Sequence, residues 1–154
     1  MIANDEQFVE AWLYWGRGTV KAQLEGLICG NTKEIVLVPK IPELRDANNR
    51  TISKAWIGFK SVETASDATA NAAFTSAGGL LSITTTEVAG QGQILSDSEG
   101  SPELRFDLTA ANTAALTAHA TYHCSIQVKM SDGALYEVER FTFNTSRQVI
   151  TATS

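Results

Sequence analysis

Apolar and polar side chains alternate without a break through residues 122–130, and this alternation constrains the fold more than any other feature of the chain. Successive side chains of an extended chain point to opposite faces, so a period of two indicates a strand with one buried face. The apolar face comprises Tyr122, Cys124, Ile126, Val128 and Met130, and the polar face comprises His123, Ser125, Gln127 and Lys129. Such a strand is typical of an antiparallel sheet that covers a core on one side.

Shorter segments repeat this pattern. Residues 53–60 and 104–108 alternate, with Trp56 on the face opposite the core, whereas residues 35–38 form a continuous apolar run that ends at Pro39. Several short strands separated by turns predict one antiparallel, immunoglobulin-like β-sandwich over about residues 33–151. The expected inward positions include Ile57, Phe59, Leu104, Phe106, Leu108, Tyr122, Ile126, Val128 and Phe141.

The chain is expected to reverse direction directly after the long alternating strand. Asp132 and Gly133 favour the positive φ angles of a two-residue primed hairpin turn, which predicts an adjacent antiparallel return strand. In that return strand the apolar phase slips by one residue between Val138 and Phe141. A β-bulge near Glu139 and Arg140 would restore the inward face on both sides of the slip.

The segment before the long strand has the pattern of a tyrosine corner. Thr109 can cap a short helix over residues 109–116, and Tyr122 stands two residues before Cys124. In this arrangement the tyrosine hydroxyl bonds an upstream backbone group and holds the corner, so we predict that structural role for Tyr122. Cys29 lies far upstream for an inter-sheet partner, and we interpret Cys124 as a small core residue.

Five segments, taken in order, resemble a known module. They read ISKAWIGFK (52–60), SDATANAAF (66–74), GQGQI (90–94), LRFDLTAANTAAL (104–116) and YHCSIQVKMSDGALY (122–136). Together they are similar to a recurrent module of tailed bacteriophages, which resembles the N-terminal domain of siphophage upper baseplate proteins and occurs in tail and fibre gene products. The usual module ends its hairpin with a glycine-containing strand, where this chain has Glu137 to Arg140 instead.

The resemblance covers about residues 33–151, and it implies a small β-sandwich that serves as an attachment or adaptor unit in a virion. Other tail, neck, baseplate or fibre proteins would be its partners, through protein–protein contacts and as a homo-oligomer within the particle. The implied location is the virion, after synthesis in the cytoplasm of a host bacterium.

Residues 1–30 lie outside the resemblance, and we treat them as an N-terminal extension to a sandwich domain of residues 31–154. Asn4 can cap a helix that would place Phe8, Ala11, Trp12 and Trp15 on one face. A hairpin of residues 11–15 and 19–24 around Gly16 and Gly18 is the alternative, and residues 19–28 suit either a helix or a strand. The aromatic cluster of this segment is a predicted partner-binding element, composed of Phe8, Trp12, Tyr14 and Trp15.

Charge and polarity exclude several classes of partner. The net charge is −5 and the twelve basic residues are dispersed, whereas a nucleic-acid surface concentrates Lys and Arg, so we expect no nucleic-acid partner. The first residues are acidic and no long apolar run follows, which predicts neither a secretory signal nor a membrane association.

No motif in the sequence indicates catalysis, a cofactor or a metal. His119 and His123 are the only histidines, and their expected placement on a corner and a strand separates them, so we predict no metal site. A nucleophile elbow, a P-loop and a Cys/His pair with an orienting carboxylate are all missing, and we predict a protein that is not an enzyme. The alternative to a virion component is a carbohydrate-binding β-sandwich for host adhesion, with exposed Trp56 as a sugar platform.

Overall fold

The protein is mainly β, as the sequence predicted. The computed structural model describes residues 11–12, 19–39, 51–95 and 102–149, and all structural statements below refer to these ranges. The elements in chain order are β1 (Ala11–Trp12), α1 (Val20–Leu24), β2 (Leu27–Cys29), β3 (Lys33–Pro39), β4 (Ile52–Lys60), β5 (Gly78–Ile83), β6 (Gly92–Leu95), β7 (Glu103–Leu108), α2 (Ala110–Ala115), β8 (Thr121–Met130) and β9 (Leu135–Arg147).

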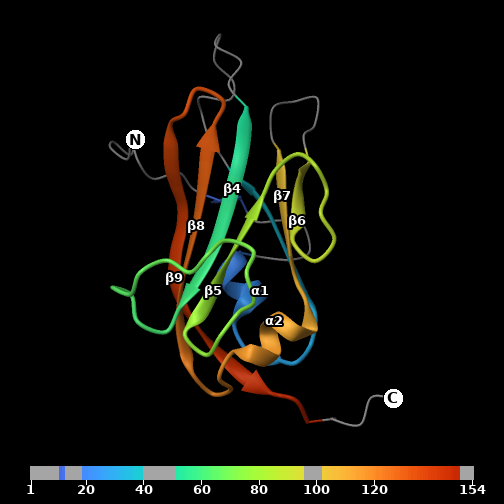
Figure 1. The fold of residues 1–154 in the computed structure, drawn as a ribbon, viewed down its shortest axis with the longest axis vertical. Coiled ribbons are helices and arrows are strands. Elements are labelled where there is room, and N and C mark those ends of the chain that lie inside the picture. Colours follow the sequence, from blue (N-terminus) through green and yellow to red (C-terminus); the bar gives the residue numbers. More distant parts are fainter. Residues whose placement is uncertain (1–10, 13–18, 40–50, 96–101, 150–154) are drawn as a thin grey trace.

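Two sheets form the layers of a sandwich-like fold. One sheet has the strand order β1-β3-β7-β6 and the other has the order β2-β9-β8-β4-β5. All neighbouring strands are antiparallel except β2 and β9, which run in parallel. Figure 1 shows β9, β8 and β4 side by side along the long axis of the molecule, with β7 and β6 on the other side of the view.

Helix α1 joins the two sheets at one side. Its N-cap Thr19 accepts a hydrogen bond from the backbone N–H of Ala22 at 3.1 Å. The side chain of Gln23 bonds to Val36 in β3, and the ammonium of Lys21 donates to the carbonyl of Thr142 in β9. The helix therefore contacts β3 of the first sheet and β9 of the second.

The core lies between the sheets and matches the predicted inward face closely. Eight of the nine expected positions are at most 2% exposed, and Trp56 is half-buried on the opposite face as expected. Phe141 is the exception, because its ring is only partly buried against the core and lies under the ammonium of Lys21, 6.0 Å from the ring centroid. Phe143 occupies the fully buried position instead, with its ring 5.3 Å from that of Phe59.

A β-bulge is present in β9, one residue before the predicted position. Ile126 pairs with Glu139 and Gln127 pairs with Glu137, so Val138 is the extra residue. Val138 is fully buried, and Glu139 is left half-buried, where desolvation raises the pKa of its carboxyl. The bulge thus keeps both Val138 and Phe143 in the core across the phase slip.

Tyr122 forms the predicted corner. Thr109 caps α2 by accepting a hydrogen bond from the N–H of Asn112 at 3.1 Å. The Tyr122 hydroxyl accepts a hydrogen bond from the N–H of Thr117 at 2.8 Å and donates one to the carbonyl of Ser76 at 2.8 Å. This fully buried side chain therefore ties the corner after α2 to the loop of residues 61–77.

The hairpin between β8 and β9 differs from the predicted two-residue turn. The N–H of Gly133 donates to the carbonyl of Met130, and the N–H of Met130 donates to the carbonyl of Ala134, so three residues form the loop. Only Gly133 has a positive φ, of 93°, whereas a primed turn needs positive φ at Asp132 as well. The side chain of Asp132 instead accepts a hydrogen bond from the N–H of Ala134 at 3.0 Å.

The described part of the N-terminal segment is integrated into the sandwich. Ala11 and Trp12 form a strand that pairs with Pro39 and Val38, so the predicted helix across these two residues is wrong, and so is their pairing with residues 19–24. Residues 20–24 are helical, and Val20, Leu24 and Leu27 belong to the core cluster. Among the described residues, no helix is long and apolar enough to cross a membrane.

Candidate functional site

The outer face of the second sheet carries an open hollow of about 480 Å³ over strands β4, β5, β8 and β9. The register of the strands explains which side chains meet there. Trp56 pairs with Gln127, Gly58 pairs with Ser125, and Lys60 pairs with His123, so alternate residues of β4 and β8 line one surface. The other lining residues are Glu63, Asp67, Leu80, Cys124, Leu135 and Arg140.

Gly58 creates the depth of the hollow. It lies in the middle of β4 between Trp56 and Lys60, where any larger residue would project a side chain from the centre of the sheet face. A Cβ built there would lie 3.3 Å from the Cδ1 atom of Leu80 on the neighbouring strand. The φ of Gly58 is not positive, so the glycine does not relieve backbone strain, and it leaves room at the surface that the end of the Leu80 side chain borders.

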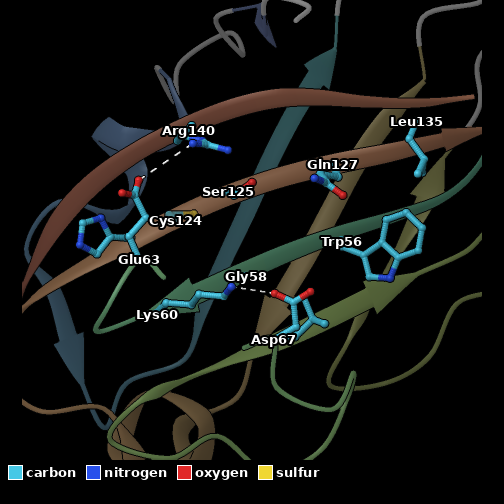
Figure 2. A pocket seen from close by; sticks show the side chains of 12 residues that line it. Trp56, Gly58, Lys60, Glu63, Asp67, Cys124, Ser125, Gln127, Leu135 and Arg140 are labelled. Carbon is cyan, nitrogen blue, oxygen red and sulfur yellow. Dashed lines mark ion pairs between the residues drawn. The ribbon is translucent and has the colours of Figure 1, made fainter. Parts of the chain in front are cut away.

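One end of the hollow is aromatic and apolar. Figure 2 shows Trp56 and Leu135 at this end, with Gln127 of β8 beside them. The ammonium of Lys54 lies 5.4 Å from the centroid of the Trp56 ring, within the range of a cation–π interaction. Leu135 is 57% exposed, so this end presents apolar surface to solvent.

The other end is charged, and its charges are matched. The Lys60 ammonium lies 2.8 Å from the Asp67 carboxylate and donates to the carbonyl of Ala65 at 2.7 Å. Arg140 lies 4.0 Å from Glu63 and 2.7 Å from Glu137, and the hydrogen bond to Glu137 raises the pKa of the Arg140 guanidinium. Figure 2 shows the Lys60–Asp67 and Arg140–Glu63 pairs on opposite sides of this end.

The loop of residues 61–77 supplies Glu63 and Asp67, and hydrogen bonds hold it to the sheet. Asn71 has a φ of 62°, its N–H donates to the carbonyl of Leu80 at 2.8 Å, and its side chain bonds the N–H of Ser82 at 2.9 Å. The carbonyl of Ser76 receives the hydroxyl of Tyr122. The acidic side of the hollow is therefore carried on a loop that is anchored at two points.

Two polar residues cover strand backbone groups that no neighbouring strand pairs, on β3 beyond its two-residue pairing with β1 and on the edge strand β5. On β3, Gln23 donates from Nε2 to the carbonyl of Val36 at 2.8 Å and accepts from its N–H at 2.9 Å, as a neighbouring strand would. On β5, the backbone N–H of Asn71 donates to the carbonyl of Leu80, and its side-chain Oδ1 accepts from the N–H of Ser82. Such cover prevents an extended segment of another chain from adding to these edges at those residues.

The predicted partner-binding residues are mostly not placed by the structure. Phe8, Tyr14 and Trp15 lie outside the described residues, and for Trp12 only the backbone pairing with Val38 is described. Tyr122 is in the core and does not line the hollow. Trp56, which the sequence suggested as a sugar platform, does line the hollow.

The cysteines and histidines do not gather into a reactive group. Cys29 and Cys124 are free thiols, and burial raises the pKa of both, most strongly for Cys124, which is the core residue that the sequence predicted. Both are therefore weak nucleophiles at neutral pH. His123 lines the hollow and His119 lies on the corner with a φ of 57°. The described residues contain no group of three or more His, Cys, Asp or Glu side chains suited to a metal ion.

Sequence reasoning missed most of the hollow, in particular Lys60, Asp67 and Arg140. These are ordinary polar residues on the outer faces of strands or in a loop, and only the register brings them together. One signal was present, because Gly58 interrupts the alternation of residues 53–60 on the same face as Trp56. A glycine inside a strand often marks close approach of a ligand or of another chain.

No family model matches the chain, and no curated protein matches it. Among solved structures, it is similar to a DUF4466 family protein from Parabacteroides merdae ATCC 43184, with a TM-score of 0.34 and 16% sequence identity. The similarity covers 78% of this chain and 40% of that protein, so the chain spans less than half the length of this structural neighbour.

Proposed function

We propose that the protein is a structural component of a tailed bacteriophage particle, an adaptor that acts by contacts between virion proteins of the tail, neck, baseplate or fibre. The observation that carries the proposal is the place of the five phage-like segments in the fold. They coincide with β4, the loop over the hollow, the start of β6, the β7–α2 corner and the β8–β9 hairpin. The five segments therefore lie on successive elements of one sandwich.

The corner supports the same proposal, because it ties the last segment to residues that follow two of the others. Tyr122 from the last segment bonds Thr117, the residue after the fourth segment, and Ser76, two residues after the second segment. Parts of the chain that are far apart in sequence are thus held together next to these segments. A module that is used repeatedly as an adaptor needs such a rigid framework beneath variable surfaces.

Particle association tests the proposal. Virions purified by density gradient from producing cells should contain the protein at a constant ratio to the major capsid protein in independent preparations. Tail or portal genes beside its gene would agree with this result. A ratio that varies between preparations, or falls to background after the gradient, would contradict the proposal.

The N-terminal aromatic cluster gives the second arm of the test. We expect a variant without residues 1–18 to fold, because the deletion stops before the Thr19 cap of α1 and spares the buried Val20 and Leu24. It removes β1, whose pairing with β3 is limited to two residues. It should unfold cooperatively but no longer enter particles. A truncated chain that is unfolded would place Trp12, Tyr14 and Trp15 among the residues needed for folding and would refute their docking role.

A further inference from the structure

We propose that the hollow on the outer sheet face binds a neutral oligosaccharide, with one sugar ring stacked on Trp56 and the chain running along β4 toward Lys60. The inference rests on the shape and charges of the hollow and does not depend on the virion role. A volume of about 480 Å³ lies within the range of small-ligand sites.

The aromatic end suits a pyranose ring. Such a ring has an apolar C–H face and a rim of hydroxyl groups, so it binds where a flat aromatic surface adjoins polar side chains. Trp56 is half-buried, which keeps part of its indole on the surface while its position is held by the sheet. Directly across the strand pair, Gln127 offers an amide that both donates and accepts hydrogen bonds, as a hydroxyl rim requires.

The length of the hollow suits more than one ring. Trp56 and Lys60 are four residues apart on one strand, which corresponds to about 13 Å at about 3.3 Å per residue. This distance exceeds the length of a single pyranose ring and matches a short oligosaccharide. Gly58 lies between the two residues and projects no side chain toward the second ring, whose site Leu80 borders.

The charges favour a ligand without net charge. The lining contains two cationic side chains, Lys60 and Arg140, and two carboxylates, Asp67 and Glu63. Lys60 lies 2.8 Å from Asp67, and Arg140 lies 4.0 Å from Glu63 and 2.7 Å from Glu137, so neither lining cation is left unpaired to hold a phosphate or an acidic sugar. Paired carboxylates and cations still offer free lone pairs and N–H groups to hydroxyls, which makes this end a hydrogen-bonding surface.

The covered sheet edges argue against a peptide as the occupant. An extended peptide binds a sheet by pairing with the backbone of an edge strand. The hollow lies on a face, where the backbone groups of β4 and β8 are paired with each other, and Asn71 covers the adjacent edge of β5 at Leu80 and Ser82. Side chains are therefore the groups that the face offers, as sugar recognition requires.

Binding should be measured with a panel of neutral di- to tetrasaccharides built from glucose, galactose, mannose and N-acetylglucosamine. Saturation-transfer NMR and tryptophan fluorescence titration of the full chain are suitable readouts. We expect at least one series to bind with a Kd on the order of 1 mM or tighter, since an open hollow desolvates only one side of the ligand. Longer members of that series should bind more tightly than the disaccharide.

Variants assign the binding to the hollow. Trp56→Ala should weaken binding by at least about tenfold, whereas Trp56→Phe, which keeps a ring, should weaken it less. Gly58→Thr should abolish binding by filling the space between Trp56 and Lys60. The strand should tolerate it because the φ of Gly58 is not positive and because the 3.3 Å contact of the new Cβ falls on Cδ1, at the end of the Leu80 side chain, which can turn away. Val88→Ala, at an exposed residue that does not line the hollow, is the matched control and should bind as the parent does.

Thermal unfolding of each variant must accompany the titrations. If Trp56→Ala is unfolded, Gly58→Thr and Trp56→Phe decide the result, since both keep a large side chain at position 56. The proposal is overturned if no member of the panel binds at 10 mM, or if binding persists unchanged in folded Trp56→Ala and Gly58→Thr. Crosslinking from position 56 to another virion protein in intact particles would also overturn it, because the hollow would then be a protein interface.

Discussion

Removal of one oxygen atom, by Tyr122→Phe, tests how the corner stabilises the fold. The phenylalanine ring keeps the buried volume and the stacking on Phe143, whose centroid lies 6.2 Å away. The change therefore isolates the hydroxyl, which accepts from Thr117 and donates to Ser76, both at 2.8 Å. An intramolecular hydrogen bond contributes about 0.5–1.5 kcal/mol net, and a buried group left unpaired costs about 1–3 kcal/mol.

The expected loss follows from the exposure of the two partners. Thr117 and Ser76 are exposed residues, so water can reach part of their backbone, and the full cost of two buried orphan groups does not apply. Two lost bonds give a destabilisation of about 1–3 kcal/mol. With a urea m value of about 2 kcal/mol/M, the midpoint of unfolding should fall by about 0.5–1.5 M.

Two measurements check this reasoning. Urea unfolding of the parent and of Tyr122→Phe gives the midpoints and shows through equal m values that the unfolded surfaces are comparable. Native-state hydrogen exchange should show faster exchange at the Thr117 amide, which loses its acceptor. Amides in the middle of β8 should change only as much as the free energy of global unfolding changes. Equal midpoints, or an unchanged Thr117 amide, would refute a structural role for the hydroxyl.

Three further predictions follow from the core, an edge and the bulge. Phe106→Ala should destabilise by about 3–5 kcal/mol in denaturant unfolding, since the ring is fully buried, and a loss below about 1 kcal/mol would contradict that burial. Gln23→Ala should destabilise the protein by about 1–3 kcal/mol, because both backbone groups of Val36 lose their partner. The freed groups should also increase aggregation, measured by light scattering. A monomeric variant of full stability would contradict the role of Gln23 in covering β3. Glu139→Gln should stabilise the protein at pH 7, because burial raises the folded-state pKa of the carboxyl and disfavours its charged form in the folded protein. This advantage should shrink as the pH falls from the raised folded-state pKa toward the ordinary carboxyl value, and it should disappear below that value, where the parent is protonated in both states. Unfolding midpoints measured from pH 3 to pH 8 that show no difference between parent and variant would contradict this sign.

The elements that the sequence predicted well are those with local signals. The alternation around Ile126 and the cap at Thr109 each involve residues within one turn or strand, and both are present as expected. The hairpin type was wrong because Asp132 uses its side chain to bond Ala134 and keeps a negative φ. The sequence pattern indicates a reversal there but does not decide between loops of two and three residues.

The remaining differences come from tertiary contacts. Residues 20–24 alternate well enough for a strand, but Gln23 finds its partners on β3 only when this segment is helical. The hollow needs the pairing of β4 with β8 and a loop from residues 61–77, which no local pattern reveals. Phe141 looked like an inward residue of the return strand, and its partial exposure depends on its place beside Lys21 of α1.

The virion role and the sugar-binding role are assigned to different surfaces, and one set of variants can test whether these surfaces act independently. The hollow lies on the outer face of β4, β5, β8 and β9, whereas residues 11–12 join the other sheet through β3. We therefore expect the deletion of residues 1–18 to abolish incorporation into particles and to leave sugar binding within about twofold of the parent, a difference below about 0.5 kcal/mol. Trp56→Ala should show the opposite result, with normal incorporation and lost binding. If either variant loses both activities while its unfolding midpoint is unchanged, the hollow and the N-terminal segment act as one site, and the assignment of glycan binding to an independent face is wrong.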